Sequence, residues 1–283
     1  MVVFPDYARR LAFSADGDLR VMYTNGIGYQ NLTPDTTAYE TMPVWSPDGN
    51  YVAFVSNRSG DEDIFIAPAS APGDEAQQIN ITYQPGQDIT PAWSPDGRQL
   101  AFASNRYDSW GIYVLELILT EPMSDNPVLL GPLRRTHNAR YEGHPAWSPD
   151  GQYIAYTSDQ GHRWQIRLME RSGTGQQAFP GTEWFLSTAY PAWSPDGERL
   201  AFAGRKKQNW DIYVMSRTGE EITQLTTDPA QDWGPRWSPD GEWIAFTSDR
   251  SGNGDIYLVR PDVTEEVRLT DNPAVELYPA WEP

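Results

Sequence analysis

The chain has 283 residues, no cysteine, and 21 Lys+Arg against 39 Asp+Glu, which gives a formal net charge of −18. The absence of cysteine excludes disulfides, thiolate metal sites and thiol catalysis, and the negative charge argues against a nucleic-acid partner because it repels phosphate. The longest mostly apolar run, 112–119, contains Glu116 and is far shorter than the roughly 20 residues of a membrane helix, so no membrane insertion is expected. No secretory apolar segment precedes the first repeat, so no signal peptide is expected in this sequence.

The first predicted strands lie between residues 7 and 33. Residues 11–14 (LAFS) match the second strand of the units that follow, residues 18–21 (DLRV) match the third, and residues 31–33 (NLT) match the end of a unit. A first strand is missing from this part of the chain.

Five complete units follow, and they begin near Pro43, Pro91, Pro145, Pro191 and Pro235. In each unit a tryptophan follows the proline by two residues and leads into Ser-Pro-Asp-Gly, where proline presets φ and glycine accepts a left-handed conformation in a turn. An alternating strand such as 243–247, an aromatic and β-branched strand such as 255–260, and a short fourth strand such as 265–270 complete the unit. The unit after Trp93 is the longest, and its extra residues, around 121–132, are predicted to form a surface loop.

The chain ends with one more first strand, PAWEP at 279–283. The motif tryptophans recur at intervals of 44 to 54 residues, at Trp45, Trp93, Trp147, Trp193, Trp237 and Trp281, and such a period is typical of a β-propeller. The sequence therefore predicts an all-β fold, a single six-bladed propeller over 1–283 with four antiparallel strands per blade. Residues 279–283 would join residues 7–33 in a composite blade that closes the ring, which removes an exposed sheet edge and favours a monomer.

The repeat PAWSPDG, followed by segments such as QLAFAS, DIYVMS and QLT, closely resembles the repeat of TolB-type six-bladed propellers and is similar to the propeller of the tricorn protease. The resemblance covers essentially the whole chain. It implies a non-catalytic bacterial interaction domain of the periplasm or another extracytoplasmic compartment, while a cytoplasmic location stays open. The extra N-terminal α/β domain of TolB itself has no counterpart here, so the identity of a partner does not transfer.

An acidic residue stands three positions before the blade proline in five of the six units, at Glu40, Asp88, Glu142, Asp232 and Glu276, while Thr188 occupies the sixth position. A threonine six or seven residues earlier supports this alignment, at Thr33, Thr82, Thr136, Thr182, Thr226 and Thr270. Because first strands line the channel of a propeller, these carboxylates are predicted to form an anionic ring at the channel mouth. Such a ring would bind a basic group or a calcium ion. The alternative is a structural role inherited with the repeat.

Aromatic residues are predicted near the same mouth. Trp110, Trp164 and Trp210 lie in loops between second and third strands, and His144, Tyr190, Trp233 and Tyr278 lie directly before or within the first strands. Exposed rings around a charged centre are typical of protein interfaces. Packing of each loop tryptophan on its own blade is the favoured alternative for Trp110, Trp164 and Trp210, and both interpretations stay open for the other four.

The leading functional hypothesis is a non-catalytic propeller that binds a basic or extended peptide of a protein partner at an acidic channel mouth. One alternative is a sensor or gating domain of a larger protein, as in tricorn-like peptidases. Another is a hydrolase or lyase that holds calcium on the carboxylate ring. No resident cofactor is expected beyond this calcium alternative.

Overall fold

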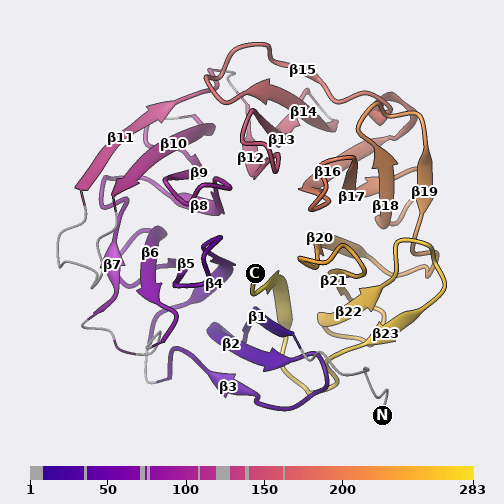
Figure 1. Cartoon of the computed structure of the whole chain (residues 1–283), viewed down its shortest axis with the longest axis horizontal. Coiled ribbons are helices and arrows are strands. Elements are labelled where there is room, and N and C mark those ends of the chain that lie inside the picture. The colour runs from indigo at the N-terminus through magenta and orange to yellow at the C-terminus, as the bar shows by residue number, and fades with distance from the viewer. Residues whose placement is uncertain are drawn as a thin grey trace.

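The computed structural model describes residues 9–34, 37–70, 74, 77–107, 109–118, 128–137, 140–161 and 163–283. These residues form six four-stranded antiparallel sheets, which we name blades A to F, around a central axis (Figure 1). The predicted six-bladed propeller is therefore confirmed. Within the described ranges, no helix has the length and apolar character needed to span a bilayer.

Blade A is the composite sheet that closes the ring. Its strands, in order from the axis, are β24 (Glu276–Trp281), β1 (Arg10–Ala15), β2 (Asp18–Tyr23) and β3 (Gln30–Asn31). Leu11 pairs with Trp281 and Ala15 pairs with Glu276 across the junction of the two chain ends. The predicted closure by the C-terminal strand is confirmed.

The other five blades each take four consecutive strands. Blade B contains β4 (Glu40–Trp45), β5 (Tyr51–Ser56), β6 (Asp63–Pro68) and β7 (Ile79–Asn80), and blade C contains β8 (Asp88–Trp93), β9 (Gln99–Ser104), β10 (Gly111–Ile118) and β11 (Val128–Arg134). Blade D contains β12 (Glu142–Trp147), β13 (Tyr153–Asp159), β14 (Trp164–Glu170) and β15 (Gln177–Ala178). Blade E contains β16 (Ser187–Trp193), β17 (Arg199–Arg205), β18 (Asp211–Ser216) and β19 (Ile222–Gln224), and blade F contains β20 (Asp232–Trp237), β21 (Ile244–Ser248), β22 (Asp255–Val259) and β23 (Glu266–Arg268).

The insertion predicted as a loop at 121–132 is wrong in its second half. Residues 121–127 lie outside the described residues, but 128–132 belong to β11 and pair with β10, as Leu129 does with Leu117. The reason is that β10 runs on to Ile118 and offers a longer ladder than the third strands of the other blades.

The hydrophobic core consists of six clusters, each between two neighbouring blades and each containing one motif tryptophan. Trp193 of blade E, for example, packs with Ile166 of blade D, and Trp237 of blade F packs with Ile212 of blade E. The motif tryptophans are buried. They therefore pack in the cores that join neighbouring blades.

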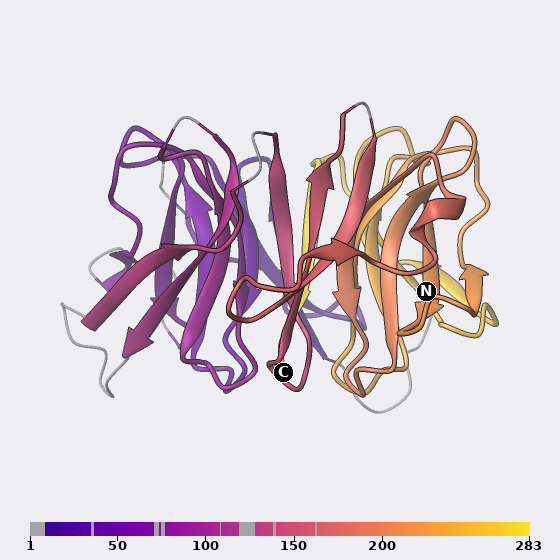
Figure 2. The same cartoon turned by 90° about the horizontal axis from the view of Figure 1, so that it is seen from above.

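The Ser-Pro-Asp-Gly turns lie at one end of the strands, and we call this the turn face. In blade F the Ser238 hydroxyl donates to Asp240 Oδ1 at 2.5 Å, and the same oxygen accepts the Glu242 N–H at 3.0 Å. The opposite loop face carries the connections between second and third strands, around 57–62, 105–110, 160–163, 206–210 and 249–254. Figure 2 shows the blades from the side, with connections at both ends of the strands.

Candidate binding site on the loop face

A bulge interrupts every inner strand immediately before the blade proline. In β20, for example, Trp233 pairs with Thr247 and Arg236 pairs with Ala245, so the two residues between them on β20 oppose one residue on β21. The residue before the proline has positive φ in all six blades, at Met42, Thr90, His144, Tyr190, Gly234 and Tyr278. Non-glycine residues adopt this conformation at a cost. Because a bulge inserts one residue into the alternation, side chains before and after it face opposite ways.

A small cavity on the axis, to which all six inner strands contribute, is lined by residues at and just after this bulge and by none of the acidic positions. Its lining consists of Met42, Pro43, Val44, Thr90, Pro91, His144, Tyr190, Arg236, Tyr278 and Pro279. These side chains leave a volume of about 20 Å³, close to the minimum for a single water molecule. Arg236 is the only charged residue of this lining among the described residues.

The predicted ring of carboxylates does not face the channel, and this part of the site prediction is wrong. Glu40, Asp88, Glu142, Asp232 and Glu276 begin their inner strands, but each is 0% exposed. They lie before the bulge, and their side chains contact the second strand of their own blade and, for Asp88 and Asp232, also the threonine that ends the preceding unit. Glu142, for instance, pairs with Ser158 on the second strand.

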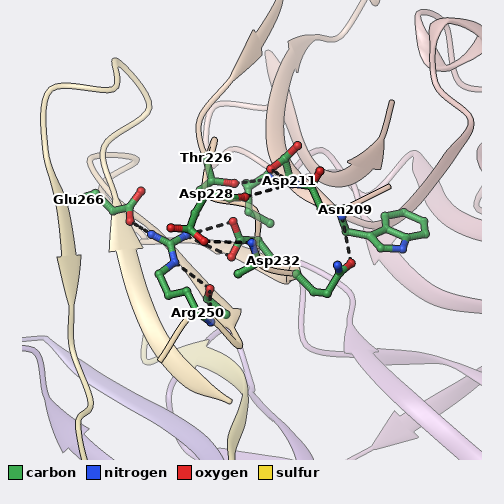
Figure 3. A network of polar contacts seen from close by, with 12 residues as sticks. Asn209, Asp211, Thr226, Asp228, Asp232, Arg250 and Glu266 are labelled. Carbon is green, nitrogen blue, oxygen red and sulfur yellow. Dashed lines mark hydrogen bonds and ion pairs between the residues drawn. The ribbon is translucent and has the colours of Figure 1, made fainter. Parts of the chain in front are cut away.

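Three of these carboxylates are paired with an arginine that follows eighteen residues later. Arg106 lies 2.8 Å from Asp88, Arg250 lies 3.1 Å from Asp232, and Arg58 bridges to Glu40. Figure 3 shows Arg250 between Asp232 and Glu266. Burial raises the pKa of Asp232, and hydrogen bonds from Ser248 and Thr226 together with the Arg250 charge oppose that rise. These ion pairs hold the loop against the blade.

The two remaining carboxylates have polar partners instead of arginine. Glu142 accepts from the Ser158 hydroxyl at 3.4 Å, and Glu276 accepts from the Asn272 amide. Within the part of the chain that the structure describes, no three His, Asp or Glu side chains gather closely enough to hold a metal ion. The predicted calcium site therefore finds no matching set of ligands in these residues.

Blade E departs from this pattern, and its alignment through Thr182 is wrong. In the other blades the repeat threonine accepts the N–H of the third strand, as Thr226 does from Ile212 at 2.9 Å. In blade D the matching N–H, that of Ile166, donates to the Thr188 hydroxyl at 2.9 Å. Thr182 instead begins a 3-10 turn, Thr182–Trp184, and its hydroxyl donates to the Phe179 carbonyl. The position that is acidic in the other blades is therefore a threonine in blade E, because its hydroxyl accepts the Ile166 N–H.

The predicted aromatic residues do gather on the loop face. Tyr141 lies between Trp110 and Trp164, with ring centroids 5.3 and 5.1 Å away, and His144 lies 4.1 Å from Tyr190. Sequence reasoning missed Tyr141, although it stands directly before the acidic position of blade D. Trp110 and Trp210 also pack on neighbouring cores, as the structural alternative expects.

A pocket of about 630 Å³ opens where blades D, E and F meet, and we call it the blade E pocket. Four rings line it, those of Trp164, Tyr190, Trp210 and Trp233. The rest of its lining is Ser187, Ala189, Arg205, Gln231 and Asp249. Trp164 is 37% exposed, and Tyr190, Trp210 and Trp233 are half-buried. The structure thus brings four of the predicted aromatic residues into one concave site.

Three predicted residues lie outside this pocket. Trp110 belongs to the cluster around Tyr141, while His144 and Tyr278 line the channel. Burial lowers the pKa of His144 to about 3, and the Arg236 charge acts in the same direction. His144 therefore stays neutral over the whole physiological range.

Comparison with known proteins agrees with this architecture. The model of the TolB beta propeller domain matches residues 73–183 and 145–283, more than half of the chain. TolB from Acinetobacter baumannii is 19% identical with a TM-score of 0.81, and the alignment covers 99% of this chain and 68% of that one. A putative TolB from Agrobacterium tumefaciens is 19% identical with a TM-score of 0.72, and the alignment covers 98% of this chain and 100% of that one.

A puromycin-hydrolyzing peptidase from Mycobacterium tuberculosis is 17% identical with a TM-score of 0.63, and the alignment covers 95% of this chain and 44% of the peptidase. No curated protein matches the chain. At these identities the solved structures establish the fold alone. The match to the family model rests on the repeat sequence and therefore shows the family. Together with six blades built on the same repeat, these matches show that the chain belongs to the TolB beta propeller domain family.

Proposed function

We propose that this propeller is a non-catalytic interaction domain that holds an extended segment of a protein partner across its loop face. The blade E pocket receives one large side chain of that segment as an anchor. The observation that carries this proposal is the convergence of Trp164, Tyr190, Trp210 and Trp233 on one cavity of about 630 Å³. Binding energy at protein interfaces concentrates in a few aromatic residues at desolvated pockets, and this volume falls in the range of ligand pockets.

The family supports a location in the bacterial envelope, because TolB-type propellers work there. The basic partner expected from the sequence loses its physical basis, since the five carboxylates are fully buried. Two parts of that hypothesis remain: the partner contributes an extended peptide, and aromatic residues of the loop face bind it.

A gating role in a larger protein is less well supported. The similarity to the peptidase propeller favours it, because that propeller is part of a longer chain. However, the cavity on the axis that Met42, His144 and Tyr278 help to line has a volume of only about 20 Å³, which is too small for a peptide.

Selection of binders from a phage-displayed library of random twelve-residue peptides tests the proposal. We expect enriched sequences with an aromatic or large aliphatic anchor, and binding that is lost in Trp233→Ala. The matched control is Trp184→Ala, which removes a tryptophan that is 72% exposed and lies outside the pocket. Failure to enrich any peptide, or equal binding to the two variants, would contradict the proposal.

A further inference from the structure

The repeat changes at three neighbouring positions beside the blade E pocket. The acidic residue becomes Thr188, the serine that pairs with it becomes Gly204, and the following Asn or Asp becomes Arg205. Gly204 is required because a Cβ at this position would lie 2.7 Å from the ring of Phe185, which follows the 3-10 turn. Blade A also lacks the serine, since Ala15 pairs with Glu276, but blade E alone changes all three positions. Such a local break in a repeat is expected at functional or strained sites.

The residue at the Arg205 position has a structural task in four other blades. Asn57 Oδ1 accepts the Tyr39 N–H at 2.8 Å, Asn105 Oδ1 accepts the Gln87 N–H at 2.7 Å, and Asp249 Oδ1 accepts the Gln231 N–H at 2.8 Å. Asp16 does the same for Val275 at 3.0 Å. In each case a short polar side chain fixes the segment that leads into the inner strand.

Arg205 has no such task, because blade E continues its ladder to this residue. Ser187 pairs with Arg205, and the Leu186 N–H donates to the Arg205 carbonyl at 2.7 Å. The backbone therefore fixes the lead-in segment by itself. The side chain of Arg205 is left to line the pocket, with its guanidinium 5.7 Å from the ring centroid of Trp210.

The guanidinium of Arg205 has no carboxylate partner among the described residues, and its buried Nε has no hydrogen-bond partner there. Arg106 and Arg250 lie at similar places in other loops but are paired with buried carboxylates. Asp249 also lines the pocket, but it is exposed and already accepts the Gln231 N–H. Two exposed lysines, Lys206 and Lys207, follow Arg205 directly. Arg205 thus begins a run of three cations on a chain of net charge −18, and it is the member of that run that lines the pocket.

We propose that the blade E pocket selects an acidic peptide segment, in which a carboxylate stands next to the aromatic anchor and pairs with Arg205. This inference rests on the proposed function and specifies the chemistry of its partner. An arginine already stacked on a tryptophan is well placed, because its planar fork can bind a carboxylate through two hydrogen bonds while its face covers the ring. The indole walls then cover the neighbouring ring of the segment.

Three synthetic ten-residue peptides test this inference on the full chain. They share a central tryptophan and neutral ends and differ only in the four flanking residues, which are all glutamate, all glutamine or all lysine. Dissociation constants come from the anisotropy of a fluorescein label. We expect the glutamate peptide to bind about tenfold more tightly than the glutamine peptide, and the lysine peptide to bind most weakly.

Variants assign the preference to one side chain. Arg205→Gln should remove the difference between the glutamate and glutamine peptides, and Arg205→Glu should reverse the preference toward the lysine peptide. The matched control is Arg199→Gln, because Arg199 also lies over a tryptophan, Trp237 at 4.6 Å, but outside the pocket. This control should leave the preference unchanged.

The outcomes separate the two proposals. If all three peptides bind equally and Trp233→Ala abolishes binding, the acidic selectivity is overturned and the peptide-binding function stands. If Arg199→Gln changes the preference as much as Arg205→Gln, overall charge is responsible and the inference is overturned. If the glutamate peptide does not bind at 1 mM protein, both proposals are overturned.

Discussion

Blades E and F share one architecture but use their loop-face cations differently. In blade F, Asp232 is 0% exposed and Arg250 pairs with it, so the arginine fastens a loop to its blade. In blade E, Thr188 replaces the carboxylate, Lys206 lies over the rings of Phe185 and Tyr213, and Arg205 lines a pocket. A repeat protein can thus convert a position that fastens a loop into one that lines a pocket by changing a few residues in one unit.

The largest expected effect concerns what the two blades have in common. Trp193→Ala in blade E and Trp237→Ala in blade F should each lower the free energy of unfolding by about 3 kcal/mol or more, because each removes a large buried ring. Both tryptophans are 8% exposed, so the two losses should agree within about 1 kcal/mol. Urea denaturation measures both. A loss below about 1 kcal/mol in either variant would contradict the description of the core.

The next effect separates the two blades. Arg250→Gln should lower the free energy of unfolding by about 3 kcal/mol at pH 7, because it leaves the Asp232 carboxylate buried without its cation. Arg205→Gln should change it by less than about 0.5 kcal/mol, because this side chain has no buried partner. Urea denaturation of both variants beside the wild type is the measurement. Equal losses would show that Arg205 also has a structural role.

The third effect lies at the junction of the two blades, where Asp211 of blade E faces the network of Figure 3. Burial, and next the Asp232 charge, raise the pKa of Asp211 to about 6 from its usual 3.8. The folded state therefore binds this proton more tightly than the unfolded state, and the free energy of unfolding falls as pH rises between about 4 and 6. Above that window the ionised group costs about 3 kcal/mol, most of which develops between pH 4 and pH 7.

Asp211→Asn should remove this part of the pH dependence. The difference in unfolding free energy between variant and wild type should shift in favour of the variant by about 2 kcal/mol from pH 4 to pH 7. The effect of His144 on the pH dependence of the unfolding free energy has the opposite sign, because its pKa is lowered to about 3 from 6.5. His144 is present in both proteins, so its effect cancels in the difference between them. A difference that does not change with pH would contradict the raised pKa.

The fold could be predicted from the sequence because the tryptophan repeat and the unpaired strands at the two ends leave few other arrangements. The direction in which the side chains of Glu40, Asp88 and Asp232 point could not be predicted, because it depends on a bulge that changes the alternation of the inner strand. A signal was nevertheless available, since Arg58, Arg106 and Arg250 each follow an acidic position by eighteen residues. That spacing indicates an ion pair within the blade.

The blade E pocket could be predicted only in part. The rings of Trp164, Trp210 and Trp233 were evident, but their convergence with Tyr190 depends on how blades D, E and F pack. The change from Asn or Asp to Arg205 was visible in the repeat, and a comparison of the six units position by position would have found it.

The pairing of β1 with β24 also bears on how this protein is made. Residues 10–15 are synthesised well before their partner strand, 276–281, because the other five blades lie between the two strands in the sequence. Blades B to F can each form from a local stretch as synthesis proceeds, whereas blade A has to wait until β24 has been translated. Until then β1 lacks its inner partner strand, and its unpaired edge is open to pairing with another chain.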